Sequence, residues 1–248
     1  MAQSTASTPR RASQRRVTKD PDVRREELLN IALDLCREHG FEAMNVEQVT
    51  QAAGVAKGTF YHYFASKDAM LEQLVRRFGD SLFDYLSAAV DAASGTGADR
   101  IKALMQASGA YKIGQADIAY ATFLYSDGNF ALRHRLFGAW RERAREVLLP
   151  AVREGQADGS LSVAHPDAVT DIVLLLWFEA ADQLWERALA TTNVDDFVET
   201  MLAGVESIYQ AQERVLGVPA GTYVVPIGPA IVEMTRQLYR TTVEGKQS

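Results

Sequence analysis

Apolar positions recur every three to four residues along most of this chain, which is the spacing of amphipathic helices. The first such segment begins at Asp20 and Pro21, a capping residue and a proline suited to a first turn, and it ends at Gly40. Strand-like residues are confined to Tyr223–Val225, a run too short and too close to Pro226 to found a sheet. The pattern therefore predicts an all-α protein.

The same spacing gives the order of the remaining helices. Two short helices, Val46–Ala52 and about Ala56–Phe64, precede a longer one that Ser66 caps and that ends near Gly95–Gly97. Pro150 is expected to kink the helix that contains it or to end it early, because proline cannot donate the helical hydrogen bond. The further helices are expected at Ala98–Ile113, Ala116–Tyr125, Phe130–Glu154, Pro166–Leu189, Val194–Leu216 and Pro229–Thr242.

The most informative segment runs from Asn45 to Phe64 and places two short helices around Gly54. Two helices in so short a span must cross steeply, and the turn between them needs a residue that adopts positive φ easily. With Phe60 and Phe64 turned inward, the opposite face carries short polar groups and aromatic rings that can reach phosphates and base edges. This pattern is typical of a helix-turn-helix, and an ordinary helical hairpin with exposed tyrosines is the alternative.

Residues 54–67, GVAKGTFYHYFASK, resemble the DNA-binding region of the tetracycline-repressor (TetR) family of transcription regulators, and the likeness covers roughly residues 24–75. The resemblance implies an N-terminal three-helix DNA-binding domain and a C-terminal helical domain for ligand binding and dimerisation. It also implies a repressor that a small hydrophobic effector releases from a palindromic operator in double-stranded DNA. The residues that it assigns to phosphate or base contacts are Asn45, Lys57, Gly58, Thr59, Tyr61, His62, Tyr63 and Lys67.

Three positions depart from the family's usual pattern. Ala56 stands where serine or threonine usually opens the recognition helix, so one cap, worth ~1 kcal/mol, is absent. Thr50 takes a place commonly held by alanine, so its hydroxyl needs a backbone partner. Asn45 replaces a threonine and can still cap its helix. These departures change local hydrogen bonding and leave the predicted fold as it is.

The net charge of −6 at first argues against a nucleic-acid partner, but the charge is unevenly distributed. Residues 1–67 hold ten Lys and Arg against eight Asp and Glu, whereas the rest of the chain is strongly acidic. A basic front on an acidic body suggests that one end approaches phosphates, with chance clustering as the alternative. We expect a disordered basic arm at 1–18, a helix-turn-helix domain at 19–67 and an effector-binding and dimerisation domain at 68–248. The arm either reaches a minor groove and flanking phosphates or is only a solubilising tail.

The C-terminal half offers apolar surface for a second copy and for a ligand. The run Ile172–Phe178 is apolar all round, and the helix at 194–216 carries one continuous apolar stripe. By the resemblance, these two helices pair with their symmetry mates, although both could instead line the core of a monomer. The homodimer residues expected on this basis are Val173, Trp177, Phe197, Met201 and Val205. The resemblance also implies an effector cavity lined by aromatic residues that would otherwise be ordinary core, namely Tyr120, Phe123, Phe137, Trp140 and Trp177.

Other classes of protein find little support. Cys36 is the single cysteine, which excludes an intrachain disulfide and gives no sign of secretion. The four histidines form no zinc-ligand pattern, and no phosphate loop or hydrolase motif is present, so no enzyme, metal or cofactor is expected. A non-specific DNA-organising protein is opposed by the acidic net charge. No signal peptide or membrane-spanning run is found, so no membrane contact is expected and the cytoplasm is the predicted location.

Overall fold

The computed structural model describes residues 20–41, 43–114, 120, 123–124, 129–224 and 227–243, and it contains no strand within these ranges. The prediction of an all-α fold is confirmed. Within the same ranges no helix combines the length and the apolar character needed to cross a bilayer. The N-terminal arm and most of the helix expected at Ala116–Tyr125 lie outside the described residues.

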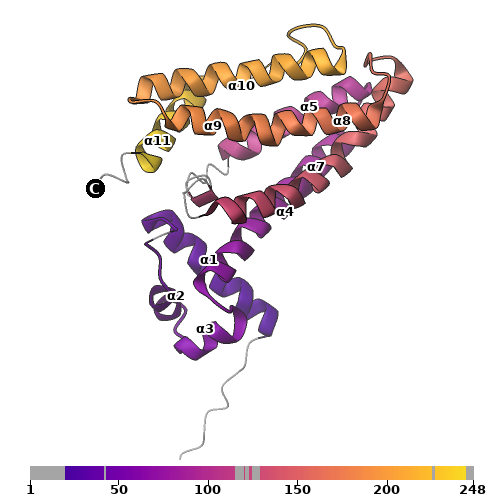
Figure 1. Cartoon of the computed structure of the whole chain (residues 1–248). Coiled ribbons are helices and arrows are strands. Elements are labelled where there is room, and N and C mark those ends of the chain that lie inside the picture. The colour runs from indigo at the N-terminus through magenta and orange to yellow at the C-terminus, as the bar shows by residue number, and fades with distance from the viewer. Residues whose placement is uncertain are drawn as a thin grey trace, which may run out of the picture.

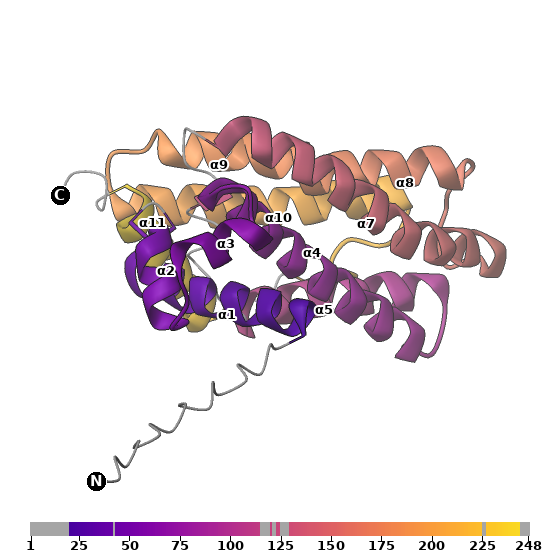
Figure 2. The same ribbon diagram turned by 90° about the horizontal axis from the view of Figure 1, so that it is seen from below.

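The helices form a small N-terminal unit and a larger body (Figure 1). The N-terminal unit contains α1 (Pro21–His39), α2 (Val46–Ala52) and α3 (Lys57–Tyr63), and α4 (Lys67–Ala92) runs from it into the body. In the body, α5 (Gly97–Gly114) and α7 (Phe130–Asp158) pack on α4. An unbroken helical rod follows, made of α8 (Pro166–Leu175), the π-helical turn η2 (Leu176–Ala180) and α9 (Ala181–Leu189). Figures 1 and 2 both show α10 (Val194–Leu216) alongside this rod, and α11 (Pro229–Thr242) packs on α10.

Capping side chains set the starts of several helices where the sequence predicts them. The carboxylate of Asp20 accepts a hydrogen bond from the Asp22 amide at 2.9 Å, and the Ser66 hydroxyl accepts one from the Ala69 amide at 3.1 Å. These oxygens satisfy amides that have no partner within the first turn of a helix. At the other end of α1, Gly40 adopts a φ of +86°, which turns the chain away from the helix axis.

The helix α7 continues through Pro150 to Asp158, so of the two expected effects of this proline, a kink or an early end, the early end does not occur. Proline leaves the carbonyl of Glu146 without its helical donor. Both residues are exposed, so water can bond to that carbonyl. Ala151 and Val152, which follow the proline, are buried and hold the last turns against the body.

The N-terminal unit and the body share one hydrophobic core. Leu28 and Ala32 of α1, Phe60 of α3 and Leu74 of α4 are fully buried in it, and Phe123 from the segment before α7 joins them. A second core lies between α4, α5, α7, α8 and α10. The shared core fixes how the N-terminal unit sits on the body, because its side chains come from both.

Candidate nucleic-acid interface and internal cavity

Hydrogen bonds at α2 and the following turn hold the predicted helix-turn-helix together. The Asn45 side chain accepts from the Gln48 amide, and the Gln48 side chain accepts from the Asn45 amide, both at 2.9 Å. This reciprocal pair satisfies two amides that would otherwise lack partners. The hydroxyl of Thr50 donates to the Glu47 carbonyl at 3.0 Å, which is the backbone partner that this departure from the family pattern requires. Gly54 has a φ of +62°, a conformation that other residues rarely adopt, and it lets the chain turn into α3.

The short helix α3 buries one side and exposes the other. Phe60 and Phe64 are at most 1% exposed, and they pack against the first helix and α4. The opposite side exposes Lys57, Gly58, Tyr61 and His62, and Thr59, Tyr63 and Lys67 are half-buried beside it. Asn45 is exposed at the start of α2. In Figure 1, α3 lies at the end of the molecule farthest from α10, so this surface is open to a large partner.

Lys57 forms an ion pair with Glu47 of α2, a residue that the sequence analysis does not single out. The hydrogen bond between them lowers the pKa of the Glu47 carboxyl and raises the pKa of the Lys57 ammonium group, so both are charged at neutral pH. Both side chains are more than half exposed, and such pairs contribute little to stability. Lys57 is the first residue of α3, and the pair fixes where its ammonium group lies. A phosphate or base would have to compete with Glu47 for this ammonium group.

Replacing Ala56 by serine is expected to stabilise α3 by ~1 kcal/mol, because Ala56 is the N-cap residue and makes no side-chain capping bond. The backbone there is already extended, at φ −72° and ψ 150°, as an N-cap requires. Slower amide exchange across residues 57–63 and a higher denaturant midpoint would measure the gain. Ala56→Val is the matched control, since valine cannot accept a hydrogen bond, and equal protection in both variants would contradict the prediction.

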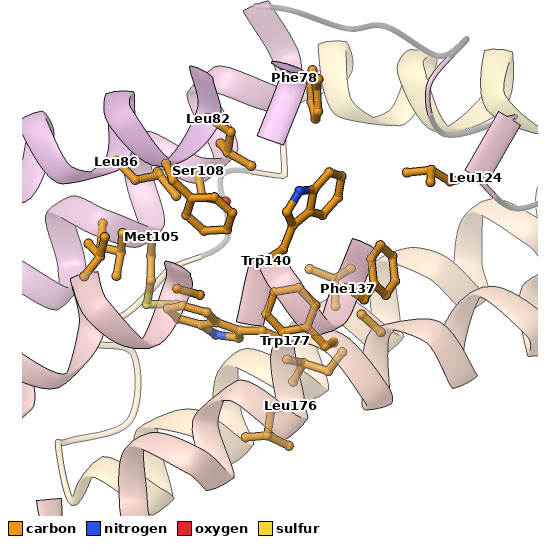
Figure 3. A pocket seen from close by; sticks show the side chains of 18 of the residues that line it. Phe78, Leu82, Leu86, Met105, Ser108, Leu124, Phe137, Trp140, Leu176 and Trp177 are labelled. Atoms are coloured by element: carbon orange, nitrogen blue, oxygen red, sulfur yellow. The ribbon is translucent and has the colours of Figure 1, made fainter. Parts of the chain in front are cut away.

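A partly open cavity of about 460 Å³ lies in the body between α4, α5, α7, η2 and α10 (Figure 3). Its lining includes Tyr120, Phe137, Trp140 and Trp177, four of the five aromatic residues that the sequence analysis assigned to an effector pocket. Phe123 is not among them, and its assignment is corrected. Its ring stacks on Phe41, with centroids 4.6 Å apart, and thereby fills the junction with the N-terminal unit.

Most side chains of the cavity wall could not be recognised from the sequence. The missed side chains are apolar residues on the buried faces of their helices, so nothing in the pattern distinguishes them from ordinary core. Among them are Phe78, Leu82 and Leu86 of α4, Ile208 and Tyr209 of α10, and Met234 and Leu238 of α11.

Polar contacts hold one wall of the cavity in place. The indole nitrogen of Trp177 donates to the side-chain oxygen of the fully buried Gln212 at 2.8 Å. Trp177 belongs to η2, and such π-helical turns widen a helix locally and are frequent at functional sites. Glu179, also in η2, pairs with Arg141 of α7. Among the described residues, no group of three or more His, Cys, Asp or Glu side chains is placed to hold a metal ion.

Of the five residues predicted for a dimer interface, two are buried within the single chain and three are half-buried. Val173 and Phe197 are completely buried in this single chain, so they cannot contact a partner, and their assignment is corrected. Trp177 and Val205 line the cavity, and Met201 is half-buried against a small core that includes Phe197. The apolar stripe of α10 is covered by α9 and α11 of the same chain. The exposed apolar residues of α8 are instead Ile172 (44% exposed) and Leu175 (49% exposed).

Comparison with known proteins places the N-terminal unit among bacterial regulators. Residues 28–74 match the family model for bacterial regulatory proteins of the tetR family. Over 158 residues the chain is 29% identical to the HTH-type transcriptional repressor KstR2 of Mycolicibacterium smegmatis, covering 62% of this chain and 73% of that relative. The repressor of the same name from Rhodococcus jostii is 42% identical over 66 residues, which is 27% of this chain and 32% of the relative.

The fold agrees with this match over a larger part of the chain. A TetR-family transcriptional regulator from Pectobacterium atrosepticum aligns with a TM-score of 0.61 at 20% identity, covering 80% of this chain and 96% of the other. The family match spans most of α1, the whole of α2 and α3, and the first turns of α4, and so includes the helix-turn-helix. Residues 28–74 therefore carry the DNA-binding region of the tetR family of bacterial regulatory proteins, and most of the chain shares the fold of such a regulator.

Proposed function

We propose that this chain is a transcription repressor that binds a palindromic operator as a homodimer and leaves it when a small hydrophobic effector fills the cavity. The observation that carries the proposal is the exposed side of α3, held by a capped α2 and a glycine turn at the end of the molecule. The two KstR2 proteins that it resembles are named as repressors, which supports repression as the outcome.

The exposed side of α3 has the chemistry that a major-groove reader needs. Gly58 has no side chain, and nothing lies within 4 Å of the position of a Cβ, so DNA can approach the backbone closely there. Lys57 and His62 can bond to base edges, and the ring of Tyr61 can contact a thymine methyl group. The hydroxyls of Thr59 and Tyr63 and the ammonium group of Lys67 suit phosphate oxygens, which position a protein on the duplex.

A single short helix reads few bases, so the proposal needs two copies. Two-fold symmetric readers of this kind place their recognition helices ~34–36 Å apart, one turn of B-DNA, on the two halves of a palindrome. Ile172 and Leu175 expose apolar surface on α8, next to α10, and a second copy meeting this surface would cover both side chains. This is the same pair of helices that the family resemblance assigns to dimerisation, with different residues at the contact.

Effector control follows if the filled cavity favours a different placement of the N-terminal unit. Helix α4 supplies part of the cavity wall and leads directly into α3 through the turn at Ser66. In a second arrangement of the dimer, the recognition helices no longer fit the two half-sites. An effector whose binding to that arrangement is more favourable by a few kcal/mol would release the protein from the operator. A ligand that fills the cavity and leaves operator affinity unchanged would contradict this part of the proposal.

Replacing Lys57 by alanine is expected to lower operator affinity by ~1–3 kcal/mol and to relax the preference for one base pair, because a base-edge contact is lost. Fluorescence anisotropy with an operator duplex and with single-base variants of it measures both effects. Lys102→Ala is the control, since Lys102 is exposed on α5 in the body. An unchanged base preference in Lys57→Ala would show that this lysine does not read sequence.

Salt dependence separates a specific repressor from a general DNA-coating protein. Binding to random duplex should fall steeply between about 50 and 200 mM salt, because it rests on displaced counterions. Binding to the operator should retain an advantage of ~10³-fold or more over random duplex throughout this range. Equal affinity for both duplexes at every salt concentration would refute sequence-specific binding.

A further inference from the structure

The wall of the cavity is apolar and uncharged. Its described lining residues come from α4, α5, α7, η2, α9, α10 and α11 and from the segment before α7, and none of them is Asp, Glu, Lys, Arg or His. The guanidinium of Arg141 lies 5.8 Å from the ring centroid of the lining residue Phe178, and it is paired with Glu179. An ionised group brought into such a space would lose its hydration without gaining a partner, which is strongly unfavourable.

Two hydroxyl groups in this wall are available to a ligand. Tyr209 and Ser108 both line the cavity, and neither hydroxyl bonds to another residue in the described part of the chain. Burial raises the pKa of Tyr209, so its phenol stays protonated and can donate. The indole nitrogen of Trp177, by contrast, is already bonded to Gln212.

We propose that the cavity binds an uncharged, largely apolar ligand that accepts one hydrogen bond from Tyr209 or Ser108. Its volume of about 460 Å³ lies within the ~300–1,000 Å³ of sites for drug-sized ligands, so a compound of two or three fused or linked rings fits. The aromatic side chains in Figure 3, Phe78, Phe137, Trp140 and Trp177, offer faces on which such rings can stack. The claim that this ligand is the effector rests on the proposed function. The preference of the cavity for uncharged compounds follows from its lining alone.

A matched pair of fluorescent probes tests the charge preference on the intact protein. N-phenyl-1-naphthylamine and 1-anilino-8-naphthalenesulfonate share one ring skeleton, and only the second carries a sulfonate. We expect the neutral probe to bind at least tenfold more tightly and to be displaced when Ala144→Trp or Ser108→Phe fills the cavity. Equal or tighter binding of the sulfonate, or neutral binding that survives both filled variants, would overturn the proposal.

The neutral ketone 6-propionyl-2-dimethylaminonaphthalene tests the hydrogen bond. Removing both hydroxyls in Tyr209→Phe with Ser108→Ala should weaken its binding about fivefold or more and shift its emission to shorter wavelength, while N-phenyl-1-naphthylamine is unaffected. Equal affinity of the ketone for both proteins would refute the hydrogen bond. None of these measurements involves DNA, so a failure of the proposed repressor function would leave their outcomes unchanged.

A row of aromatic rings connects the cavity wall with the N-terminal unit. Phe41, buried at the corner between α1 and α2, lies 5.5 Å from Tyr120 between ring centroids. Tyr120 lies 4.6 Å from Phe78, which in turn lies 6.3 Å from Trp140. The last three rings line the cavity, so a continuous row of aromatic rings joins its wall to the corner that precedes the helix-turn-helix.

The middle of this row has space on both sides. Phe78 and Tyr120 line the large cavity and also a second one of about 130 Å³, whose other walls include Leu33 and Arg37 of α1. Protein interiors are normally close-packed, so rings between two voids can shift where most core side chains cannot. A ligand that displaces these two rings would move them toward α1.

Trp140 provides a second contact, with α4, the helix that follows α3. A Cβ placed on Gly79 of α4 would lie only 2.0 Å from the indole nitrogen of Trp140, so the indole rests directly on the backbone of α4. A ligand that displaces Trp140 therefore changes a contact with α4 itself. We infer that Phe41 and Gly79 are the positioning residues through which cavity occupancy shifts the N-terminal unit, an inference that rests on the proposed function.

Thermodynamic linkage measures this coupling with N-phenyl-1-naphthylamine as the ligand. In the unmodified protein, saturating operator duplex should weaken probe binding about fivefold or more, because the two sites oppose each other by the same factor in both directions. In Phe41→Leu, the affinity for the probe alone and the affinity for the operator alone should each stay within about threefold of normal. The ratio of probe affinity without operator to probe affinity with operator should fall toward one. A ratio of one in the unmodified protein, or an undiminished ratio in Phe41→Leu, would overturn the inference.

Gly79→Ala tests the other contact without any ligand. The added methyl group forces Trp140 out of its place against α4, so we expect operator affinity to fall about tenfold, as it would with the cavity filled. Gly138→Ala in α7 is the matched control, because nothing lies within 4 Å of a Cβ there. Normal operator affinity in Gly79→Ala would refute the role of this contact. Loss of affinity in both variants would assign the effect to helix substitution in general and would also refute it.

Discussion

Glutamate at both Ile172 and Leu175 is expected to convert the protein to monomers and to lower its affinity for a palindromic operator by ~10²- to 10⁴-fold. The two side chains are 44% and 49% exposed on α8, the largest apolar exposure on the helices assigned to dimerisation. In a two-fold dimer each substituted residue would face a like charge or an apolar surface of the partner copy. The operator affinity falls because each half-site is then bound separately.

Sedimentation velocity measures the oligomeric state of this double variant, and anisotropy measures operator binding. Affinity for an isolated half-site should be unchanged, because the helix-turn-helix is untouched. Ala139→Glu, an exposed position on α7, is the matched control and should remain dimeric. Met201 is a poorer site for the charge, since it is half-buried against the chain's own core. A variant that stays dimeric would place the interface elsewhere.

Replacing Phe60 by alanine is expected to destabilise the N-terminal unit by ~3–5 kcal/mol and to abolish operator binding. Phe60 is fully buried, and its ring lies 5.3 Å from the ring of Phe64, so its loss leaves a void where α3 meets the core. Within the seven residues of α3, all of which are described, only Phe60 is buried, so no other side chain of this helix can replace its contacts with the core. The described lining of the cavity contains no residue of this unit, so N-phenyl-1-naphthylamine should still bind.

Hydrogen exchange resolves this effect because it reports on the N-terminal unit and the body separately. Amides of α1 to α3 should lose protection in Phe60→Ala while those of α7 and α10 keep it. Tyr61→Ala is the matched control: Tyr61 is 50% exposed, so stability should change by less than ~0.5 kcal/mol although DNA binding weakens. Full operator affinity in Phe60→Ala would contradict the assignment of α3 as the recognition helix.

The starts of helices and the turn at Gly54 could be predicted from the sequence, because they depend on residues close together in the chain. Asp20, Asn45 and Ser66 cap helices where they are expected to, and Gly54 takes the positive φ that the turn requires. The short glycine-cornered motif also carries enough specific residues to identify the family. These features depend on contacts between residues close together in the chain, which a single sequence displays directly.

The partners of buried side chains could not be predicted, because periodicity shows that a face is covered and not what covers it. Val173 and Phe197 were assigned to a second copy and are instead covered by their own chain. Phe123 was assigned to the cavity and instead packs on Phe41 across 82 positions of sequence. A cavity is also the absence of filling side chains, which no pattern of apolar residues reveals.

The π-helical turn and the contact of Trp140 with Gly79 are further features that could not be predicted from the sequence. Both depend on how α4, α7 and the α8–α9 rod meet in space. The run Ile172–Phe178 reads as continuous helix, and it is helical, but the apolar pattern does not show that a π-helical turn begins at Leu176 or that Trp177 in this turn bonds to Gln212. Glycine in the middle of α4 signals either a weak helix or a close approach, and only the structure distinguishes the two.

Selection of duplexes from a random DNA library by the purified protein tests whether the exposed side of α3 reads an operator. We expect enrichment of one inverted repeat whose half-sites are centred about one helical turn apart, and loss of that enrichment in Tyr63→Ala and in Lys57→Ala. Recovery of no preferred sequence, or of the same sequences by both variants, would contradict the assignment of this surface to operator recognition.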